Sequence, residues 1–217
     1  MTLVHLAAEA YRLYLLQGLE GQLALSGLEQ VAGVDEVGRG SLAGPVVAAA
    51  VIPGDRSLVP GVDDSKRLTA RQREVLADWI RASALASSVV PVSPLAIDRM
   101  NILEATRRAM TEAVAALEPQ PGCVVVDAVE LPELSMPVLP VVRGDGLSYA
   151  VACASILAKV ERDRMMRELD RDYPQYGFAT NKGYGAAVHL AALREFGPCP
   201  EHRLTFRSVL PSERLGG

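Results

Sequence analysis

Residues 31–52 read VAGVDEVGRGSLAGPVVAAAVI, two short apolar runs separated by an acidic, glycine-rich segment. The first run ends on Asp35 and Glu36, and the second, at 46–52, is closed by a Pro-Gly pair. Short apolar runs bounded by Gly and Pro predict strands, and Gly44-Pro45 predicts a tight, hairpin-like connection between these two. Adjacent carboxylates at the end of a buried strand are unfavourable unless a cation balances them.

Helices and strands alternate along the rest of the chain. The periodicity of apolar residues predicts helices over residues 3–25, about 69–83, 101–118, 148–169 and 186–197, and strands over 30–37, 46–52, 87–94, 123–129 and 136–144. Thr69 and Asn101 are the expected N-caps. These patterns predict an α/β domain in which helices cover a mixed sheet. Two of the helices have expected buried stripes, formed by Val75, Leu76, Trp79 and Ile80 and by Leu103, Met110, Val114 and Leu117.

Composition narrows the class of protein. The chain has 217 residues, 49% hydrophobic and 22% charged, which suits one globular domain with a small appendage. No apolar run approaches the ~20 residues of a membrane span, and no basic segment precedes the first apolar residues as in a signal peptide. The three scattered cysteines form no CxxC motif, so we expect a reducing, cytoplasmic setting. The net charge of −4 argues against a general nucleic-acid coat protein, but not against an enzyme with localised arginines.

Four carboxylates stand at predicted strand ends or at a helix start: Asp35, Glu36, Asp127 and Asp145. Asp35 and Glu36 point to opposite faces of a regular strand, so they can share one site only where the strand twists or breaks. Hard oxygen donors without thiols suit Mg²⁺ or Mn²⁺, and two such ions roughly 4 Å apart support phosphoryl displacement. The pattern alone therefore indicates a metal-dependent phosphotransfer site, with turn-forming and capping acids as the alternative.

Seven segments occur in order over roughly residues 28–208: VAGVDEVGRGSLAGPVVAAAVI, DDSKRLTARQRE, VVVDAV, VVRGDG, ACASILAKVERDRMM, NKGYG and HRLTF. Through these segments the sequence resembles the ribonuclease HII family. The resemblance implies a ribonuclease-H-like mixed β-sheet flanked by helices, with a small helical C-terminal region. The expected divisions are an N-terminal helical extension at 1–27, a catalytic core at 28–172, and a C-terminal region at 173–217 that completes the substrate groove.

The resemblance also implies an activity: an endonuclease that cuts RNA in RNA–DNA hybrids and 5′ to single ribonucleotides in duplex DNA. The products would carry 3′-hydroxyl and 5′-phosphate ends, as needed to remove ribonucleotides and RNA primers. Carried over by motif, the catalytic and metal residues are Asp35, Glu36, Asp127 and Asp145, holding two Mg²⁺ or Mn²⁺ ions. The substrate residues are Gly38, Arg39 and Gly40 at the 2′-hydroxyl and phosphate, Lys66 at a phosphate, and Tyr184 at the sugar of the RNA–DNA junction.

Other interpretations of single residues stay open at this point. Tyr184 could be a surface aromatic, and Lys66 part of a solvated turn. Asp163 lies four residues from both Lys159 and Arg167, so helical ion pairing explains it, and it is the reserve candidate for Asp145. We expect structural roles for His189 and Cys153.

The sequence departs from the family pattern at two positions. Ser41 stands where proline is usual, and Ala128 where glycine is common. We expect Ser41 to relax the loop after Gly40 and Ala128 to add a methyl group near the metals, with activity retained. The rival functions are another nuclease or transposase of the same fold and a non-catalytic nucleic-acid-binding module. We expect a monomer, no clamp-binding QxxLxxF-like peptide, and a disordered tail after Pro211.

Overall fold

The computed structural model describes residues 2–54 and 58–210, and the expected disordered tail lies outside this range. Its centre is a five-stranded sheet in the order β3-β2-β1-β4-β5. The strands are β1 Val31–Val37, β2 Val46–Ile52, β3 Ala86–Val92, β4 Cys123–Asp127 and β5 Val138–Val141. β1 and β3 pair antiparallel with β2, whereas β4 runs parallel to both β1 and β5. The expected mixed sheet is confirmed.

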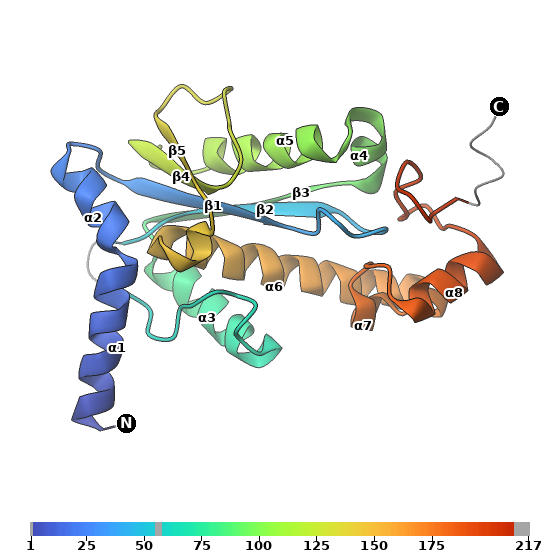
Figure 1. The fold of residues 1–217 in the computed structure, drawn as a ribbon, viewed down its shortest axis with the longest axis horizontal. Coiled ribbons are helices and arrows are strands. Elements are labelled where there is room, and N and C mark those ends of the chain that lie inside the picture. Colours follow the sequence, from blue (N-terminus) through green and yellow to red (C-terminus); the bar gives the residue numbers. More distant parts are fainter. Residues whose placement is uncertain (1, 55–57, 211–217) are drawn as a thin grey trace.

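Helices cover both faces of this sheet (Figure 1). One face carries α4 Pro94–Met100 and α5 Ile102–Ala115, and the other carries α6 Tyr149–Asp172 with α3 Ala70–Ser83 beyond it. The helices α1 Leu3–Leu16 and α2 Gly18–Leu25 lie at one end, and α7 Phe178–Asn181 and α8 Ala187–Phe196 at the other. Short 3-10 turns, η1 Gly144–Gly146 and η2 Pro174–Tyr176, precede and follow α6.

Strand β2 shows how the sheet divides the core. Its residues are all buried, and successive side chains point to opposite faces. Ala48 and Ala50 join the cluster beneath α5, while Ala49 and Val51 join the cluster beneath α6. Small side chains allow both helix layers to approach the sheet closely.

The closest approach is at Gly33 of β1. A Cβ atom at this position would lie 2.0 Å from the carbonyl carbon of Ala150 and 2.1 Å from the amide nitrogen of Val151. The first turn of α6 therefore packs directly on the backbone of β1. This contact sets the register between the strand that ends near Asp35 and the helix that carries Ser155.

Several local predictions were wrong. In the stripe predicted for α3, Leu76 and Ile80 are buried as expected, together with Ala77, but Val75 and Trp79 are 51% and 62% exposed. Leu103 is 40% exposed at the start of α5. Helix α4 was missed, since its N-terminal Pro94 was interpreted as the end of a strand. The N-terminal helix is interrupted at Gln17, and the connection between β1 and β2 is an eight-residue loop, 38–45.

The expected caps are present. Thr69 and Gln72 form a reciprocal capping box at α3, and the Asn101 carboxamide accepts hydrogen bonds from two amides at the start of α5. Across residues 2–54 and 58–210, no helix is long and apolar enough to cross a membrane.

Candidate active site

The parallel pairing of β1 with β4 brings two of the predicted carboxylates to neighbouring positions. Val34 is paired with Val126, so Asp35 and Asp127 follow side by side at the ends of the two strands. Together with Glu36 they line a cleft of about 390 Å³. The same cleft is lined by the predicted substrate residues Gly38, Arg39, Gly40, Lys66 and Tyr184.

Asp145 lies apart from the other carboxylates. It lines a neighbouring hollow of about 680 Å³ with Asp63 and Asp64, next to the turn η1. Lys66 borders both hollows, and its Nζ lies 3.4 Å from Oδ2 of Asp145. The structure thus brings together all the sequence-predicted site residues except Asp145, which Lys66 links to the cleft.

The environment of the cleft disfavours the ionised forms of Asp35 and Glu36. Burial and the adjacent Glu36 raise the pKa of Asp35 to about 8, although hydrogen bonds from Ser155 and from the Glu36 amide act in the opposite sense. Burial also raises the pKa of Glu36, although Arg39 pairs with it at 3.3 Å. Among the ion pairs of the described residues, none includes Asp35 or Asp127. A bound cation would supply the missing positive charge.

The donor set fits a hard divalent ion. The candidate ligands are carboxylate oxygens, with no thiol or imidazole among the residues that line the cleft. In the part of the chain that the structure describes, however, no three His, Cys, Asp or Glu side chains stand together as a ready-made metal site.

The loop between β1 and β2 is braced from below by a buried arginine. Arg162 of α6 donates to the carbonyl oxygens of Pro45 and Ala43, at 3.0 and 3.2 Å, and to the Ser41 hydroxyl at 2.7 Å. The Ser41 hydroxyl in turn donates to the carbonyl oxygen of Gly38 at 2.8 Å. The expectation that Ser41 relaxes this loop was wrong, because its hydroxyl ties the loop to α6.

A second buried arginine holds the same loop from the C-terminal side. Arg203 donates from Nε and Nη2 to the carbonyl oxygen of Gly44, and from Nη1 to that of Arg39. Neither Arg203 nor Arg162 has a carboxylate partner within the described residues, and both bond mainly to backbone carbonyls. Arg162 also donates to the Ser41 hydroxyl, and its buried Nη1 has no hydrogen-bond partner among the described residues. Nothing in the sequence alone signalled this bracing.

Tyr184 also lines the cleft and is 40% exposed. The Arg162 guanidinium lies over its ring, 5.6 Å from the centroid. The loops are also joined through their backbones, because the Leu42 amide donates to the carbonyl oxygen of Gly183 at 2.7 Å. Tyr184 and the glycine-rich loop are thus parts of one connected structure.

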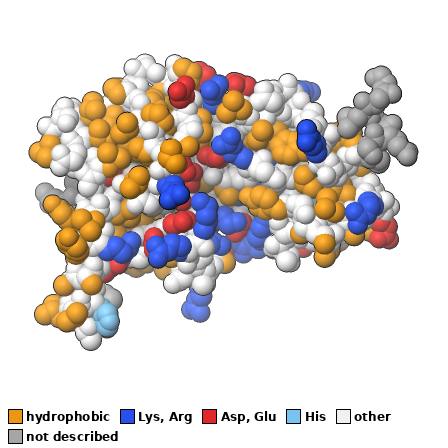
Figure 2. Space-filling model, in the orientation of Figure 1, with side chains coloured by type: hydrophobic (Ala, Val, Ile, Leu, Met, Phe, Trp, Pro, Cys, Tyr) orange, Lys and Arg blue, Asp and Glu red, His pale blue; other side chains and the backbone are white. Residues whose placement is uncertain are grey.

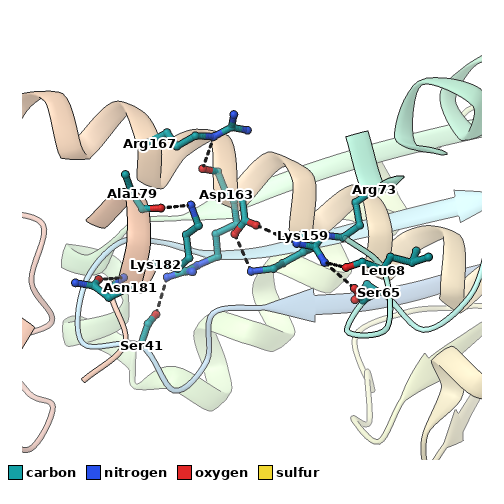
Figure 3. A network of polar contacts seen from close by, with 12 residues as sticks. Ser41, Ser65, Leu68, Arg73, Lys159, Asp163, Arg167, Ala179, Asn181 and Lys182 are labelled. Carbon is teal, nitrogen blue, oxygen red and sulfur yellow. Dashed lines mark hydrogen bonds and ion pairs between the residues drawn. The ribbon is translucent and has the colours of Figure 1, made fainter. Parts of the chain in front are cut away.

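A group of cations surrounds Asp163 beside the cleft (Figure 3). Lys159 pairs with Asp163 at 2.7 Å, as expected, and Arg73 lies 3.7 Å from it. Arg167 instead donates to the Asp163 backbone carbonyl oxygen, and its Nη2 pairs with Glu74. Lys182 lines the adjacent hollow with Arg73 and Arg167.

Four polar residues of the cleft were not predicted as site residues: Ser65, Arg73, Ser155 and Lys159. Ser155 and Lys159 lie four apart on α6, in line with Asp163, so helical spacing was the available signal. Figure 2 shows Lys and Arg side chains gathered near the middle of the face that it draws, with acidic side chains among them. The cleft itself combines buried carboxylates with the cations Arg39, Lys66, Arg73 and Lys159.

Comparison with known proteins points to one family. The sequence model of the family described as "Ribonuclease HII" matches residues 32–209. Ribonuclease HII of Ruminiclostridium cellulolyticum is 49% identical over 198 residues, covering 91% of this chain and 78% of the relative. Ribonuclease HII of Geobacter metallireducens is 53% identical over 190 residues, covering 88% and 89%.

Solved structures agree with this similarity. Ribonuclease H2 from Pyrococcus horikoshii superimposes with a TM-score of 0.73 at 28% identity, covering 82% of this chain and 94% of that one. A chain of the PCNA:RNase HII complex from Archaeoglobus fulgidus gives 0.69 at 30% identity, covering 84% and 98%.

Proposed function

This chain belongs to the ribonuclease HII family and is a ribonuclease H of type 2, and from that premise we propose that it cuts RNA in RNA–DNA hybrids and on the 5′ side of single ribonucleotides in duplex DNA. The products would carry 3′-hydroxyl and 5′-phosphate ends. The observation that supports this most directly is the cleft itself, where Asp35, Glu36 and Asp127 adjoin the loop that begins at Gly38.

The carboxylates would hold two Mg²⁺ or Mn²⁺ ions, which when bound supply an activated water and stabilise the leaving oxygen. Asp35 and Asp127 offer oxygens from adjacent strand ends, and Glu36 offers a third from the same cleft. Asp145 would join them by turning from its contact with Lys66. Asp163, already paired with Lys159 and Arg73, is better explained as the organiser of these cations than as a ligand.

Substrate discrimination would come from the loop that faces the carboxylates. The backbone around Gly38 and Gly40 lies at the cleft wall, where amides and carbonyls can bond a 2′-hydroxyl that DNA lacks. Tyr184 would pack on the sugar next to the ribonucleotide. Lys66 and Arg39 would bind flanking phosphates, and Arg73 and Lys159 would extend that contact along the strand.

The remaining expectations form part of the same proposal. The N-terminal helices would be an extension to a core at 28–172, with residues from 173 onward completing the groove. We place the enzyme in the cytoplasm, where its three buried cysteines would stay reduced, and propose that it acts as a monomer. We do not extend clamp binding to this chain from its Archaeoglobus relative.

The decisive experiment uses a labelled DNA duplex that contains one ribonucleotide, incubated with and without Mg²⁺ or Mn²⁺ beside an all-DNA duplex. We expect a metal-dependent cut 5′ to the ribonucleotide and an intact control. Cutting of both duplexes would favour a nuclease of the same fold that does not read the 2′-hydroxyl. Asp35→Asn should abolish cleavage and leave binding largely unchanged, and near-normal turnover in this variant would refute the carboxylate assignment.

A further inference from the structure

Two buried histidines lie behind Tyr184 and have no part in the proposed chemistry. His189 is in the first turn of α8 and His202 is in the segment after it; they are 0% and 2% exposed. Their rings pack edge-on against Phe178 and Tyr176, with centroids 5.4 and 4.7 Å apart, respectively. Neither histidine forms an ion pair with a carboxylate of the described residues.

Hydrogen bonds join these rings into a chain. The Cys199 amide donates to Nδ1 of His202 at 3.0 Å, and the Nε2 atoms of His202 and His189 lie 2.9 Å apart. Nδ1 of His189 lies 2.8 Å from the carbonyl oxygen of Tyr184. This series of hydrogen bonds therefore connects Cys199 in the C-terminal segment to the backbone of Tyr184 at the cleft.

The distances determine where each proton lies. The backbone amide can only donate, so Nδ1 of His202 is unprotonated and the proton of the neutral ring is on Nε2. That proton is donated to Nε2 of His189, which leaves the His189 proton on Nδ1 and directs it to the Tyr184 carbonyl oxygen, an acceptor only. The two neighbouring imidazoles are thus opposite tautomers, and every bond in the chain points the same way.

We propose that His202 and His189 are positioning residues, a one-directional hydrogen-bond relay that holds the backbone of Tyr184 at the cleft wall. This inference rests on the proposed function, because it takes Tyr184 as the residue that senses the RNA–DNA junction. The relay adds a second support to the ring of Tyr184, which Arg162 holds from the side of α6. The Ala186 amide also donates to the Tyr184 carbonyl oxygen, at 2.8 Å, so this oxygen is bonded twice.

An added proton would break the relay. A proton on Nδ1 of His202 would face the Cys199 amide, and one on Nε2 of His189 would face the N–H of His202, so donor would meet donor. Burial lowers the pKa of both histidines, and repulsion from His189 lowers the pKa of His202 further. Other titratable groups packed here are the Cys199 thiol, whose Sγ is 3.2 Å from Nδ1 of His202, and the Tyr176 hydroxyl, which donates to the Gly197 carbonyl oxygen instead. Burial and the nearby Glu201 carboxylate raise the pKa of the Cys199 thiol, so the thiol and the phenol are both neutral near pH 6.

The first test is made on the unmodified protein. In protein labelled with ¹⁵N-histidine, long-range proton–nitrogen correlations identify which ring nitrogen of each histidine carries the proton. We expect the Nε2–H tautomer for His202 and the Nδ1–H tautomer for His189, with both rings neutral at pH 6. One shared tautomer, or protonation of both rings at pH 6, would overturn the relay.

The second test separates positioning from general stability. His202→Phe keeps a ring packed against Tyr176 and Phe178 but removes the middle of the relay. Tyr176→Phe is the matched control, because it removes one hydrogen bond from the same core. The readout is the ratio of cleavage at a single ribonucleotide to cleavage of a uniform hybrid. We expect His202→Phe to lower this ratio about fivefold, the scale of one lost hydrogen bond, and Tyr176→Phe to leave it unchanged.

Tyr184→Ala distinguishes refutation of the relay from refutation of the sensing role of Tyr184. If this variant lowers the ratio and His202→Phe does not, the relay is refuted while the sensing role of Tyr184 stands. If Tyr184→Ala leaves the ratio unchanged, the sensing role falls and the positioning proposal falls with it. Where both lower it, the double variant should show no further loss, since the relay acts through Tyr184; additive losses would refute that route.

Discussion

The two glycines of the Gly38-Arg39-Gly40 triplet are equivalent in the sequence but not in the structure. Gly38 has a φ of +94°, and a Cβ atom there would lie 2.2 Å from Nε of Arg162 and 2.8 Å from its Cδ and Cζ. Gly40 has no such φ, and a Cβ atom there would meet nothing within 4 Å. Gly38→Ala and Gly40→Ala therefore form a natural pair of perturbation and control.

The expected loss of stability at Gly38 has two parts. An L-residue in the left-handed region costs roughly 1–2 kcal/mol. The methyl group must also displace the Arg162 guanidinium, whose bonds to Ser41, Ala43 and Pro45 brace the loop, and overpacking of this kind costs about 1–3 kcal/mol. We expect Gly38→Ala to lower the free energy of unfolding by about 2–5 kcal/mol, a large part of the total for a domain. Gly40→Ala should change it by less than about 0.5 kcal/mol.

Urea denaturation followed by circular dichroism measures both variants against the unmodified protein. Cleavage of the single-ribonucleotide duplex should fall in both, in Gly38→Ala because the loop is displaced and in Gly40→Ala because a methyl group faces the substrate. Equal free energies of unfolding for the two variants would refute the account of Gly38 as the point where the loop rests on Arg162.

Three further predictions follow from the site. The folded-state pKa of Asp35 is about 8, against an ordinary 3.8, so its contribution to stability is full below pH 3.8 and is lost once the pH rises through 8. Asp35→Asn should therefore stabilise the metal-free protein above pH 8 by a few kcal/mol, at roughly 1.4 kcal/mol for each pH unit that separates the two pKa values. A melting temperature that the substitution leaves unchanged in EDTA above pH 8 would contradict this. Lys66→Gln should weaken nucleic-acid binding and reduce the slope of log K against log salt by about 0.9, measured by fluorescence anisotropy, whereas an unchanged slope would exclude a phosphate contact. Ala128 is exposed and has a φ of +50°, so Ala128→Gly should relieve about 1–2 kcal/mol of backbone strain in the folded state. The glycine adds about 0.5–1 kcal/mol of conformational entropy to the unfolded chain, which offsets part of this gain. A lower melting temperature would show that the strain is absent.

The sheet and its long helix were predictable because their signals are local. Runs such as residues 46–52 and 123–127 are apolar, β-branched and bounded by turn residues, and the N-caps Thr69 and Asn101 precede clear helices. The errors arose where periodicity competes with tertiary packing. In α3 the stripe of larger apolar residues includes Trp79, but the side that packs into the core beside α6 is the one with Leu76 and Ile80.

The candidate site shows the same division. Each carboxylate could be located as the end of a strand or the start of a helix, and the pairing of Val34 with Val126 explains why Asp35 and Asp127 meet. The supports could not be predicted, because Arg162 and Arg203 bond backbone carbonyls of a loop more than 100 residues away. A side chain that binds main-chain oxygens leaves no complementary residue type in the sequence to reveal the pairing.

The bonds from the C-terminal segment to the cleft have a consequence for the order of synthesis. Arg203 bonds the carbonyl oxygen of Arg39 across 164 positions, and the Gly44 amide donates to the carbonyl oxygen of Glu201. A chain still emerging from the ribosome can pair β1 with β2 and present Asp35 and Glu36 well before these late residues exist. Its glycine-rich loop, however, lacks the partners that hold it. Ribonuclease activity should therefore arise only after residues 201–203 have been synthesised and have folded onto this loop.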